Sequence, residues 1–489
     1  MSLPNVSISK NVFTTGQAPA STTGILAILA ASSTGTANLP GGFSRTDLAV
    51  GSYGYGPLTD FFAYEVNVAN NPALLIKGNA SIAGAYGTIA KTIASSGTVV
   101  AAASAPFDHY NVIVTITVGG TVGTDGIKYT YSLDGGASTS GITALGTATT
   151  LTIPNTGVSF TVGSVFTAGD TWQVFTSRPL LGNSDVSDSL AALGNTRLPY
   201  EGILIDCSAT AVTVGLVDTI LSGWEARGVF KFAILNSRFK TEPAATAESE
   251  AAYAAAMGAA YNTATSIRQC VGVDGAHVPS AITGWNIKRP TSLLLAARAM
   301  AIPIGEDPAY VTRGAILGAQ ISDSNGNPQD HDEDLSPNLD ALRLTSLRSF
   351  APGGPNGVYI CNANTIQPSG GAFPYLQHIR IMNRACEIAW FTLTTQLSRG
   401  VRKNPKKDPV TGAVTIFEPD AALIDSIVNE ALTQPLKGQV SSALFSVSRT
   451  DDLNAVPAIV TGVLSIVALA YIKGFTVQAQ FSKTLTTAL

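Results

Sequence analysis

The feature that most constrains the fold of this chain is a regular alternation of short apolar runs and helical segments after Tyr200. Strand-like runs such as EGILIDC and FKFAILNSR are separated by amphipathic stretches such as TVGLVDTILSGWEARG. Strands that alternate with helices predict βαβ units and a largely parallel sheet with right-handed crossovers. The predicted order is strand, helix, strand, helix, strand over residues 201–207, 213–228, 230–238, 249–264 and 267–276.

A second pattern occupies the stretch between Lys91 and Arg178, where Lys128 is the only basic residue. Alternating runs such as NVIVTITV, IKYTYSL and DTWQVF are separated by turn signals such as LDGG, NTG and AGD. Alternation with period two, interrupted by such turns, is typical of antiparallel strands. The sequence therefore predicts a compact all-β module inserted between two mixed segments.

These patterns together predict a multidomain α+β chain with a mixed α/β core. Near the C-terminus, PYLQHIRIMNRACEIAWFTLTTQLSRG is a predicted long helix, and its apolar stripe comprises Leu376, Ile379, Met382, Cys386, Ala389 and Leu393. The predicted divisions are an N-terminal arm over 1–20, an α/β segment joining the core over 21–85, the inserted all-β module over 86–178, an α/β domain over 179–365, and a C-terminal α+β domain over 366–489 that ends in a strand arm.

The charge content of the chain excludes some classes of function. Of 489 residues, 29 are Lys or Arg and 33 are Asp or Glu, so that 13% are charged and the net charge is −4. A chain with this balance has no general electrostatic attraction to nucleic acid. A surface so poor in charge stays soluble more easily when much of it lies against other subunits, which hints at assembly. The four cysteines are scattered and lack metal-ligand spacing, which argues against a zinc site or a disulfide framework.

Ligands of parallel α/β sheets bind beyond the carboxyl ends of the strands, and polar residues follow the predicted strands there. An acid, a thiol, an arginine and a histidine could converge for acid–base or nucleophilic chemistry. The other interpretation is that these residues cap helices and form turns. We favour the second, and expect no catalytic residue and no cofactor, because no nucleophile elbow, phosphate loop or dinucleotide fingerprint is present. The residues concerned are Asp206, Cys207, Arg238, Asp274 and His277.

Two further segments resemble known kinds of site. The acidic stretch 323–334 (DSNGNPQDHDED) lacks the sixth-position glycine of a calcium loop, so we expect a solvated loop and no metal site. Residues 453–472 carry no charge and have the length of a membrane helix. Pro457, Gly462 and the many β-branched residues instead favour a strand buried on both faces.

A basic cluster follows the predicted long helix. It comprises Arg399, Arg402, Lys403, Lys406 and Lys407. Positive charge at a helix C-terminus is favourable by itself. The cluster could also bind an acidic protein partner or a phosphate backbone, and the sequence leaves the three interpretations open.

Several stretches resemble the tail sheath proteins of contractile phage tails and related injection machines. Tyr53–Lys77 resembles the glycine–proline turn, helix and strand near their start, and Asn286–Ala301 resembles their proline-initiated helix. Residues 342–366, followed by 373–390, are similar to the approach to their C-terminal domain, and 463–485 to their closing strands. The all-β module lies outside this resemblance, as one of the variable insertions that such proteins carry.

The resemblance implies a structural subunit that is not an enzyme. Sheath subunits polymerise around an inner tail tube, and contraction drives the tube through the host envelope. The implied partners are further copies of the chain, the tube protein, and baseplate and tail terminator proteins, without nucleic-acid contact or membrane insertion. The implied location is the virion tail of a bacteriophage, assembled in the host bacterial cytoplasm.

In this family, terminal arms add strands to sheets of neighbouring subunits, which satisfies unpaired backbone groups. Alternating apolar residues with this implied role are Val6, Ile8 and Val12 at one end, and Val477, Ala479 and Phe481 at the other. The basic cluster lies in the segment matching the C-terminal sheath domain, which implies a position facing the tube.

Two alternatives remain open at the level of sequence. The chain could be another self-assembling virion or surface-layer protein, with the β module as a binding head. It could also be an α/β hydrolase-like enzyme that uses Asp206, Asp274 and His277.

Overall fold

The computed structural model describes most of the chain, namely residues 22–92, 94–240, 248–321, 330–350, 353–367, 370–407, 411–455 and 458–473. The predicted arm residues Val6, Ile8, Val12, Val477, Ala479 and Phe481 lie outside these ranges, as does most of the acidic stretch.

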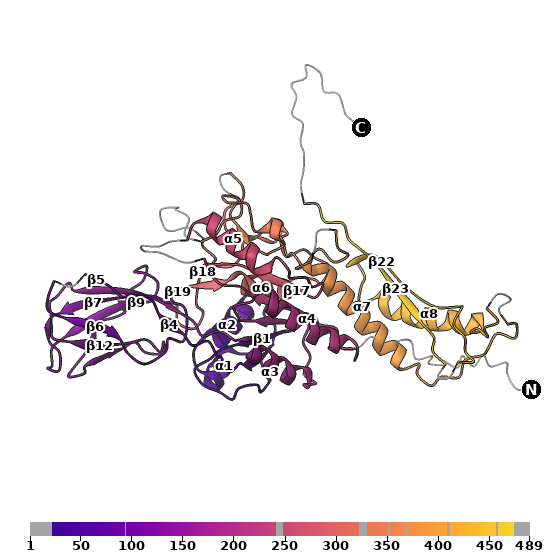
Figure 1. Ribbon diagram of the computed structural model, residues 1–489, viewed down its shortest axis with the longest axis horizontal. Helices are drawn as coiled ribbons and strands as arrows, with labels where there is room; N and C mark the ends of the chain where they lie inside the picture. Colours follow the sequence, from indigo (N-terminus) through magenta and orange to yellow (C-terminus); the bar gives the residue numbers. More distant parts are fainter. Residues whose placement is uncertain are drawn as a thin grey trace, which may run out of the picture.

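A six-stranded sheet forms the middle of the molecule (Figure 1). Its strand order is β17-β16-β15-β1-β3-β2, and all neighbours are parallel except β2 and β3. The parallel strands align through register pairs such as Leu26 with Gly202 and Leu26 with Ala73. The strands are β1 (Leu26–Ala30), β2 (Gly41–Phe43), β3 (Ala73–Lys77), β15 (Gly202–Ile205), β16 (Phe232–Asn236) and β17 (Gln269–Gly272).

Helices cover both faces of this sheet, which explains why its parallel strands are apolar at nearly every position. Alternate residues of β1 enter opposite cores, with Leu26 and Ile28 on one side and Ala27 and Leu29 on the other. The first face packs against α2 (Pro57–Ala69) and α6 (Thr291–Ala301), beside α1 (Thr46–Tyr53). The second packs against α3 (Asn183–Gly194), α4 (Ala211–Glu225) and α5 (Glu250–Tyr261).

Two details of the predicted α/β part differ from the structure. The predicted third strand, 267–276, is divided into β17 and β18 (Gly275–Pro279), because Asp274 between them adopts a left-handed φ of 50°. Strand β18 pairs antiparallel with β19 (Asn286–Pro290). The helix that the resemblance gives as proline-initiated begins at Thr291, so Pro290 is the residue before α6 and not its first residue.

The stretch between residues 85 and 177 consists of strands and turns in its described part. Its strands enclose a core, which Ile287 of β19 also enters. In this core Trp172 packs against Phe160 and Phe166 with ring centroids 5.8 and 6.0 Å apart. The strands are β4 (Ala85–Tyr86), β5 (Ala90–Thr92), β6 (Thr98–Ala101), β7 (Asn111–Val118), β8 (Gly120–Thr121), β9 (Lys128–Ser132), β10 (Thr143–Ala144), β11 (Thr150–Thr152), β12 (Ser159–Gly163), β13 (Val165–Phe166) and β14 (Thr171–Ser177).

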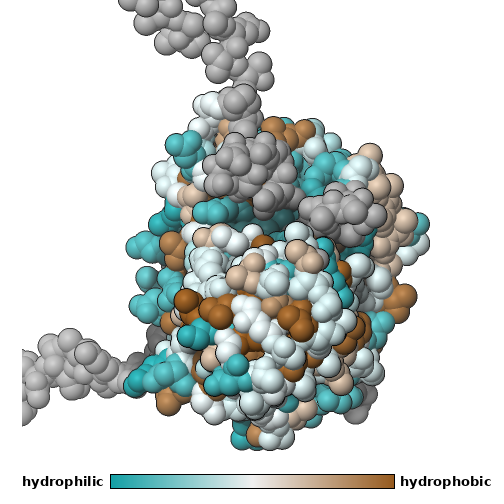
Figure 2. Space-filling view, turned by 90° about the vertical axis from the view of Figure 1, so that its left-hand side faces the viewer, coloured by the Kyte–Doolittle hydropathy of each residue, from teal (hydrophilic) through white to brown (hydrophobic). Residues whose placement is uncertain are grey.

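This β-rich region projects from one end of the molecule. Figure 2 views the molecule from that end, and white and brown residues predominate on the near face. Where the region joins the core, the buried guanidinium of Arg289 binds Asp60 of α2 and Asp108, the latter at 2.8 Å. Because charges that leave water must be paired, this three-residue cluster fixes the region to the core.

The opposite end of the molecule is formed by the C-terminal elements. Helices α7 (Leu376–Thr394) and α8 (Glu418–Thr433) share a core with the antiparallel hairpin of β22 (Val440–Val447) and β23 (Gly462–Ala468). A short pair, β20 (Leu347–Arg348) and β21 (Tyr359–Ile360), precedes α7. Among the described residues, no helix is long and apolar enough to cross a membrane.

Candidate functional site

Of the residues predicted as candidates for catalysis, Asp206 and Cys207 follow β15, Arg238 follows β16 and Asp274 follows β17, whereas His277 lies within β18. Their charged groups form internal ion pairs. Asp206 is fully buried and accepts two hydrogen bonds from the Arg178 Nε at 3.1 Å and one from Nη2 at 2.9 Å. Burial raises the pKa of the Cys207 thiol to about 12, so the nucleophilic thiolate is scarce at neutral pH. Arg238 binds Glu248 at 2.6 Å. Asp206 and Arg238 are thus engaged in ion pairs within the fold, and Cys207 is a buried, protonated thiol.

A second buried network surrounds Lys288, whose side chain is 0% exposed. Its ammonium lies 2.8 Å from Asp274 Oδ1 and 2.6 Å from Asp330 Oδ1. The imidazole Nδ1 of His277 lies 3.0 Å from the other oxygen of Asp330. Asp274 and His277 are therefore joined through Lys288 and Asp330. Asp206 instead pairs with Arg178, so the acid, thiol and histidine form no common reaction centre.

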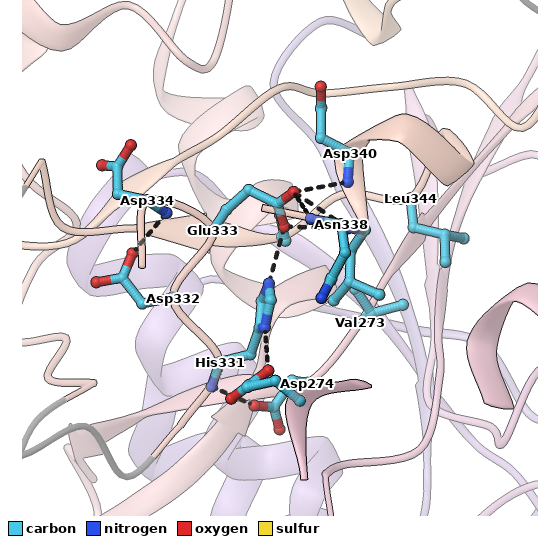
Figure 3. Close-up of polar contacts among 12 residues, drawn as sticks. Val273, Asp274, His331, Asp332, Glu333, Asp334, Asn338, Asp340 and Leu344 are labelled. Carbon is cyan, nitrogen blue, oxygen red and sulfur yellow. Dashed lines mark hydrogen bonds and ion pairs between the residues drawn. The ribbon is translucent and has the colours of Figure 1, made fainter. Parts of the chain in front are cut away.

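The described part of the acidic stretch, residues 330–334, is mostly buried and hydrogen-bonded to the rest of the fold, and is not a solvated loop (Figure 3). The His331 ring lies between Glu250 and Glu333, with nitrogen–oxygen distances of 2.7 and 2.8 Å, and its backbone N–H donates to Asp274. The expectation of a solvated loop is wrong here because 330–333 are buried against the sheet edge.

The charge state of His331 follows from its two carboxylate neighbours. Burial lowers the pKa of the imidazole, but the hydrogen bonds to Glu250 and Glu333 outweigh it and raise the pKa to about 9. Glu333 also accepts backbone N–H bonds from Asn338 at 2.8 Å and from Asp340 at 3.1 Å. No cluster of His, Cys, Asp and Glu in the described ranges has the arrangement of a metal site.

The hairpin of β22 and β23 has one covered face and one exposed face. Its inner face, with Phe445 and Val447, packs against α8. On the outer face Leu444, Val463 and Val467 are 60%, 66% and 55% exposed. The prediction of a strand buried on both faces over 453–472 is therefore wrong in two respects. The strand is shorter, and only one layer covers it, so that its second apolar face remains exposed in the isolated chain.

The two edges of this hairpin differ. At the outer edge of β22, the Asn429 side chain of α8 accepts from the Phe445 N–H at 2.7 Å and donates to its carbonyl at 2.9 Å. Asp425 of α8 accepts from the Val447 N–H at 2.7 Å. Because backbone groups alternate in direction along antiparallel strands, those of Leu464 and Ile466 point to the outer edge of β23. Within the described residues nothing bonds to them, so the outer edge of β22 is capped at Phe445 and Val447, whereas that of β23 is uncapped.

The five residues of the basic cluster are all exposed, in the segment between α7 and α8. Arg402 pairs with Asp420 at 2.7 Å and lies over the Phe417 ring, and Lys403 donates to Asn454 at 2.7 Å. Arg399 donates to Gln396 at 2.9 Å. Within the described residues, Arg402 alone of these five forms an ion pair, so the positive charge of Arg399, Lys403, Lys406 and Lys407 is available to a partner.

Sequence reasoning missed a buried ion pair between Glu201, which precedes β15, and Arg380 of α7. The Arg380 Nε lies 2.5 Å from Glu201 Oε1, and the guanidinium is 0% exposed. The available signal was an arginine four residues after Leu376 in a predicted amphipathic helix. The missing information was the partner, 179 positions earlier in the sequence.

Comparison with known proteins identifies the class of fold. No family model and no curated protein matches the sequence. Among solved structures, the chain is similar to the sheath of an extracellular contractile injection system, PVC, in the contracted state. The TM-score is 0.54 at 10% identity, covering 99% of this chain and 98% of that one. The fold is thus a mixed α/β fold of the contractile sheath type, and the resemblance inferred from sequence is confirmed at the level of fold.

Two further solved structures are similar. A chain of the anti-feeding prophage baseplate in the contracted state has a TM-score of 0.50 at 10% identity, covering 98% of both chains. The sheath tail protein Lin1278 of Listeria innocua has a TM-score of 0.44 at 12% identity, covering 93% of this chain and 97% of that chain. The two structures with TM-scores of 0.50 or more are described as parts of contractile assemblies in the contracted state.

Proposed function

We propose that this protein is the structural subunit of a contractile tail sheath. Copies polymerise as rings or a helix around an inner tail tube, and contraction drives the tube through the host envelope. The partners are further copies, the tube protein, and baseplate and tail terminator proteins. The proposed location is a bacteriophage virion tail, assembled in the host bacterial cytoplasm. The protein works without catalysis, cofactor, direct nucleic-acid contact or membrane insertion.

The observation that carries this proposal is the similarity of fold to a contracted sheath over 99% of the chain. Under the same proposal, residues 86–178 are an inserted all-β module and 366–489 are the sheath domain. The ion-paired state of Asp206, Asp274 and His277 supports a structural role over the hydrolase-like alternative.

The hairpin supplies a route for linking subunits. A strand added at the open edge of β23 would satisfy the backbone groups of Leu464 and Ile466, and it would extend the apolar outer face. Because α8 side chains close the edge of β22, the proposal places strand addition at β23. The strands to be added are the predicted arms around Val6, Ile8 and Val12, and around Val477, Ala479 and Phe481.

Negative-stain microscopy of the purified full-length protein tests the proposal. We expect hollow tubes or stacked rings. Discrete globular particles would favour the enzyme alternative, and flat arrays or shells would favour a surface-layer or other virion component.

Truncation of each arm gives a second test. Deletion of 1–15 or of 474–489 is expected to give folded subunits that do not polymerise. Circular dichroism and a thermal melt report the fold, and microscopy reports assembly. A truncated chain that unfolds would show that the arm belongs to the core of its own subunit.

A further inference from the structure

The chain enters the described fold at residues 22–24 and leaves it at residues 471–473. Both of these chain exits contact α7. At the N-terminal side, the Gly24 N–H donates to Glu201 Oε2 at 2.6 Å, and Glu201 is paired with Arg380 of α7. About two helical turns after Arg380, Glu387 of α7 accepts a hydrogen bond from the Thr22 hydroxyl at 3.4 Å. Residues 22–24 are thus attached to the middle of the helix.

At the C-terminal side, residues 471–473 are held at the beginning of α7. The Tyr471 ring packs on His378 with centroids 5.6 Å apart, and the Lys473 ammonium lies 4.4 Å from the Tyr375 ring centroid. Lys473 also forms an ion pair with Asp307. The Lys473 ammonium thus makes both an ionic and a cation–aromatic contact at this place.

The loop 302–307 after α6 connects the two attachments. The Arg380 guanidinium donates to the carbonyls of Ile302 and Pro303, each at 3.4 Å from Nη1. Two to four residues later, the Gly305 carbonyl accepts from the Tyr471 hydroxyl at 2.7 Å, and Asp307 binds Lys473. A continuous path of polar contacts therefore runs from Gly24 to Lys473 through Glu201, Arg380 and this loop.

Glycine is required at the first point of this path. Gly24 has a φ of +81°, and a Cβ atom there would lie 2.7 Å from the Asn71 side chain and 3.3 Å from the Met300 carbonyl. A larger residue would displace the chain from Glu201, because the left-handed conformation and the close approach are both unfavourable to a side chain. The entry point is thus fixed in direction as well as in position.

We propose that Arg380 is a positioning residue that couples the two chain exits to one rigid body. This inference rests on the proposed function, in which the segments beyond residues 22 and 473 bind second copies of the chain. A subunit that moves within a polymer must keep both linkages in a fixed relation. The Arg380 path supplies that relation inside the subunit, because release of one exit loosens the contacts that hold the other.

Hydrogen exchange of the full-length subunit, followed by mass spectrometry, tests the coupling. The double variant Arg380→Met, Glu201→Gln removes both charges together, since removal of one alone would leave the other buried and unpaired. Glutamine at 201 still accepts from the Gly24 N–H. We expect exchange to become at least tenfold faster in peptides covering both 22–25 and 469–473. Faster exchange at 22–25 alone would overturn the proposal.

The matched control is Arg178→Met, Asp206→Asn, a buried ion pair that contacts neither chain exit. It is expected to lower the melting temperature without faster exchange at either exit. Equal acceleration in the control would mean that general destabilisation explains the result, and would also overturn the coupling. The reverse variant, Lys473→Gln, should accelerate exchange at 22–25, because coupling between two sites is reciprocal.

Failure of the two ideas can be told apart. If the wild-type chain forms no polymers, the proposed function fails, whereas the exchange experiment still decides whether Arg380 couples the exits. If wild-type polymers form and the double variant loosens both exits, we expect shorter polymers from the variant than from the control.

Discussion

At the scale of single residues, many buried charged side chains in the described ranges are held by ion pairs or hydrogen bonds, and Glu65 is an informative contrast. Glu65 of α2 is fully buried, and neither carboxylate oxygen has a hydrogen-bond partner among the described residues. Burial raises the pKa of this carboxyl to about 8. Glu65 therefore binds its proton at neutral pH and acts as a neutral polar group.

Glu65 predicts a dependence of stability on pH. The pKa is about 8 in the folded chain and 4.5 in the reference state, so its contribution to stability is fully present below pH 4.5 and is lost as the pH rises through 8. The free energy of unfolding should fall by up to ~1.4 kcal/mol per pH unit in that window. Glu65→Gln should remove this slope in chemical denaturation, whereas the exposed control Glu430→Gln should retain it. Identical slopes in all three proteins would contradict the prediction.

The basic cluster gives a second prediction at this scale. Lys406 and Lys407 lack ion pairs within the described residues, whereas Arg402 is already bound to Asp420. Changing both lysines to glutamate should weaken co-sedimentation with purified inner tube at low salt and leave polymerisation of the subunit intact. Exposed pairs contribute only ~0.2–1 kcal/mol each and are screened by salt, so the effect should vanish at high salt. Binding equal to wild type at low salt would remove the cluster from the interface.

At the scale of elements, the difference between the edges of β22 and β23 predicts where a neighbouring strand adds. Ile466→Pro removes an N–H that the hairpin does not use, and proline is tolerated at edge positions. We expect this variant to remain folded but to form no polymers. The control Ile466→Ala also removes the isoleucine side chain but retains the backbone N–H. This control should therefore still polymerise. Microscopy of both variants decides, and polymers of the proline variant would exclude strand addition at β23.

The elements also show what sequence can predict. The apolar strands β1, β3, β15 and β16 could be predicted because burial on both faces leaves continuous apolar runs. The stripe of α7 was predicted only in part. Leu376, Ile379 and Ala389 are buried as expected, whereas Met382, Cys386 and Leu393 are only partly buried. Ile381 and Ala385, which lie outside the predicted stripe, are buried in the C-terminal core, because the helix packs against two separate cores. One period cannot describe two contact faces.

The candidate site was harder to predict, for the same physical reason. Whether Asp206 is catalytic or structural depends on Arg178, which lies in a different element, and the sequence does not pair them. Likewise, an apolar alternating strand such as β23 has the same pattern whether its second face is covered within the chain or exposed. The type of each element is a local property, whereas its partners are set by the tertiary fold.

At the scale of the whole molecule, the β-rich region is joined to the core through two segments that are distant in sequence but adjacent in space. Tyr86 pairs with Thr176 and Ala85 with Ser177, so its two ends lie side by side. Removing 90–177 and closing the gap with a short Gly/Ser linker should therefore leave a folded subunit that still polymerises. Some stability should be lost, because Arg289 keeps Asp60 but loses Asp108. A folded variant without polymers would show that the region is a contact between subunits.

The closed edge of β22 has a consequence for the time before assembly. A hairpin with two open edges invites copies to join side by side in an endless ribbon, the route by which many β-rich proteins precipitate. Here two hairpins that met through the edges of β23 would present edges of β22 that Asn429 and Asp425 cap at Phe445 and Val447. Such caps disfavour growth beyond two copies, so the hairpin is protected against runaway side-by-side association before assembly.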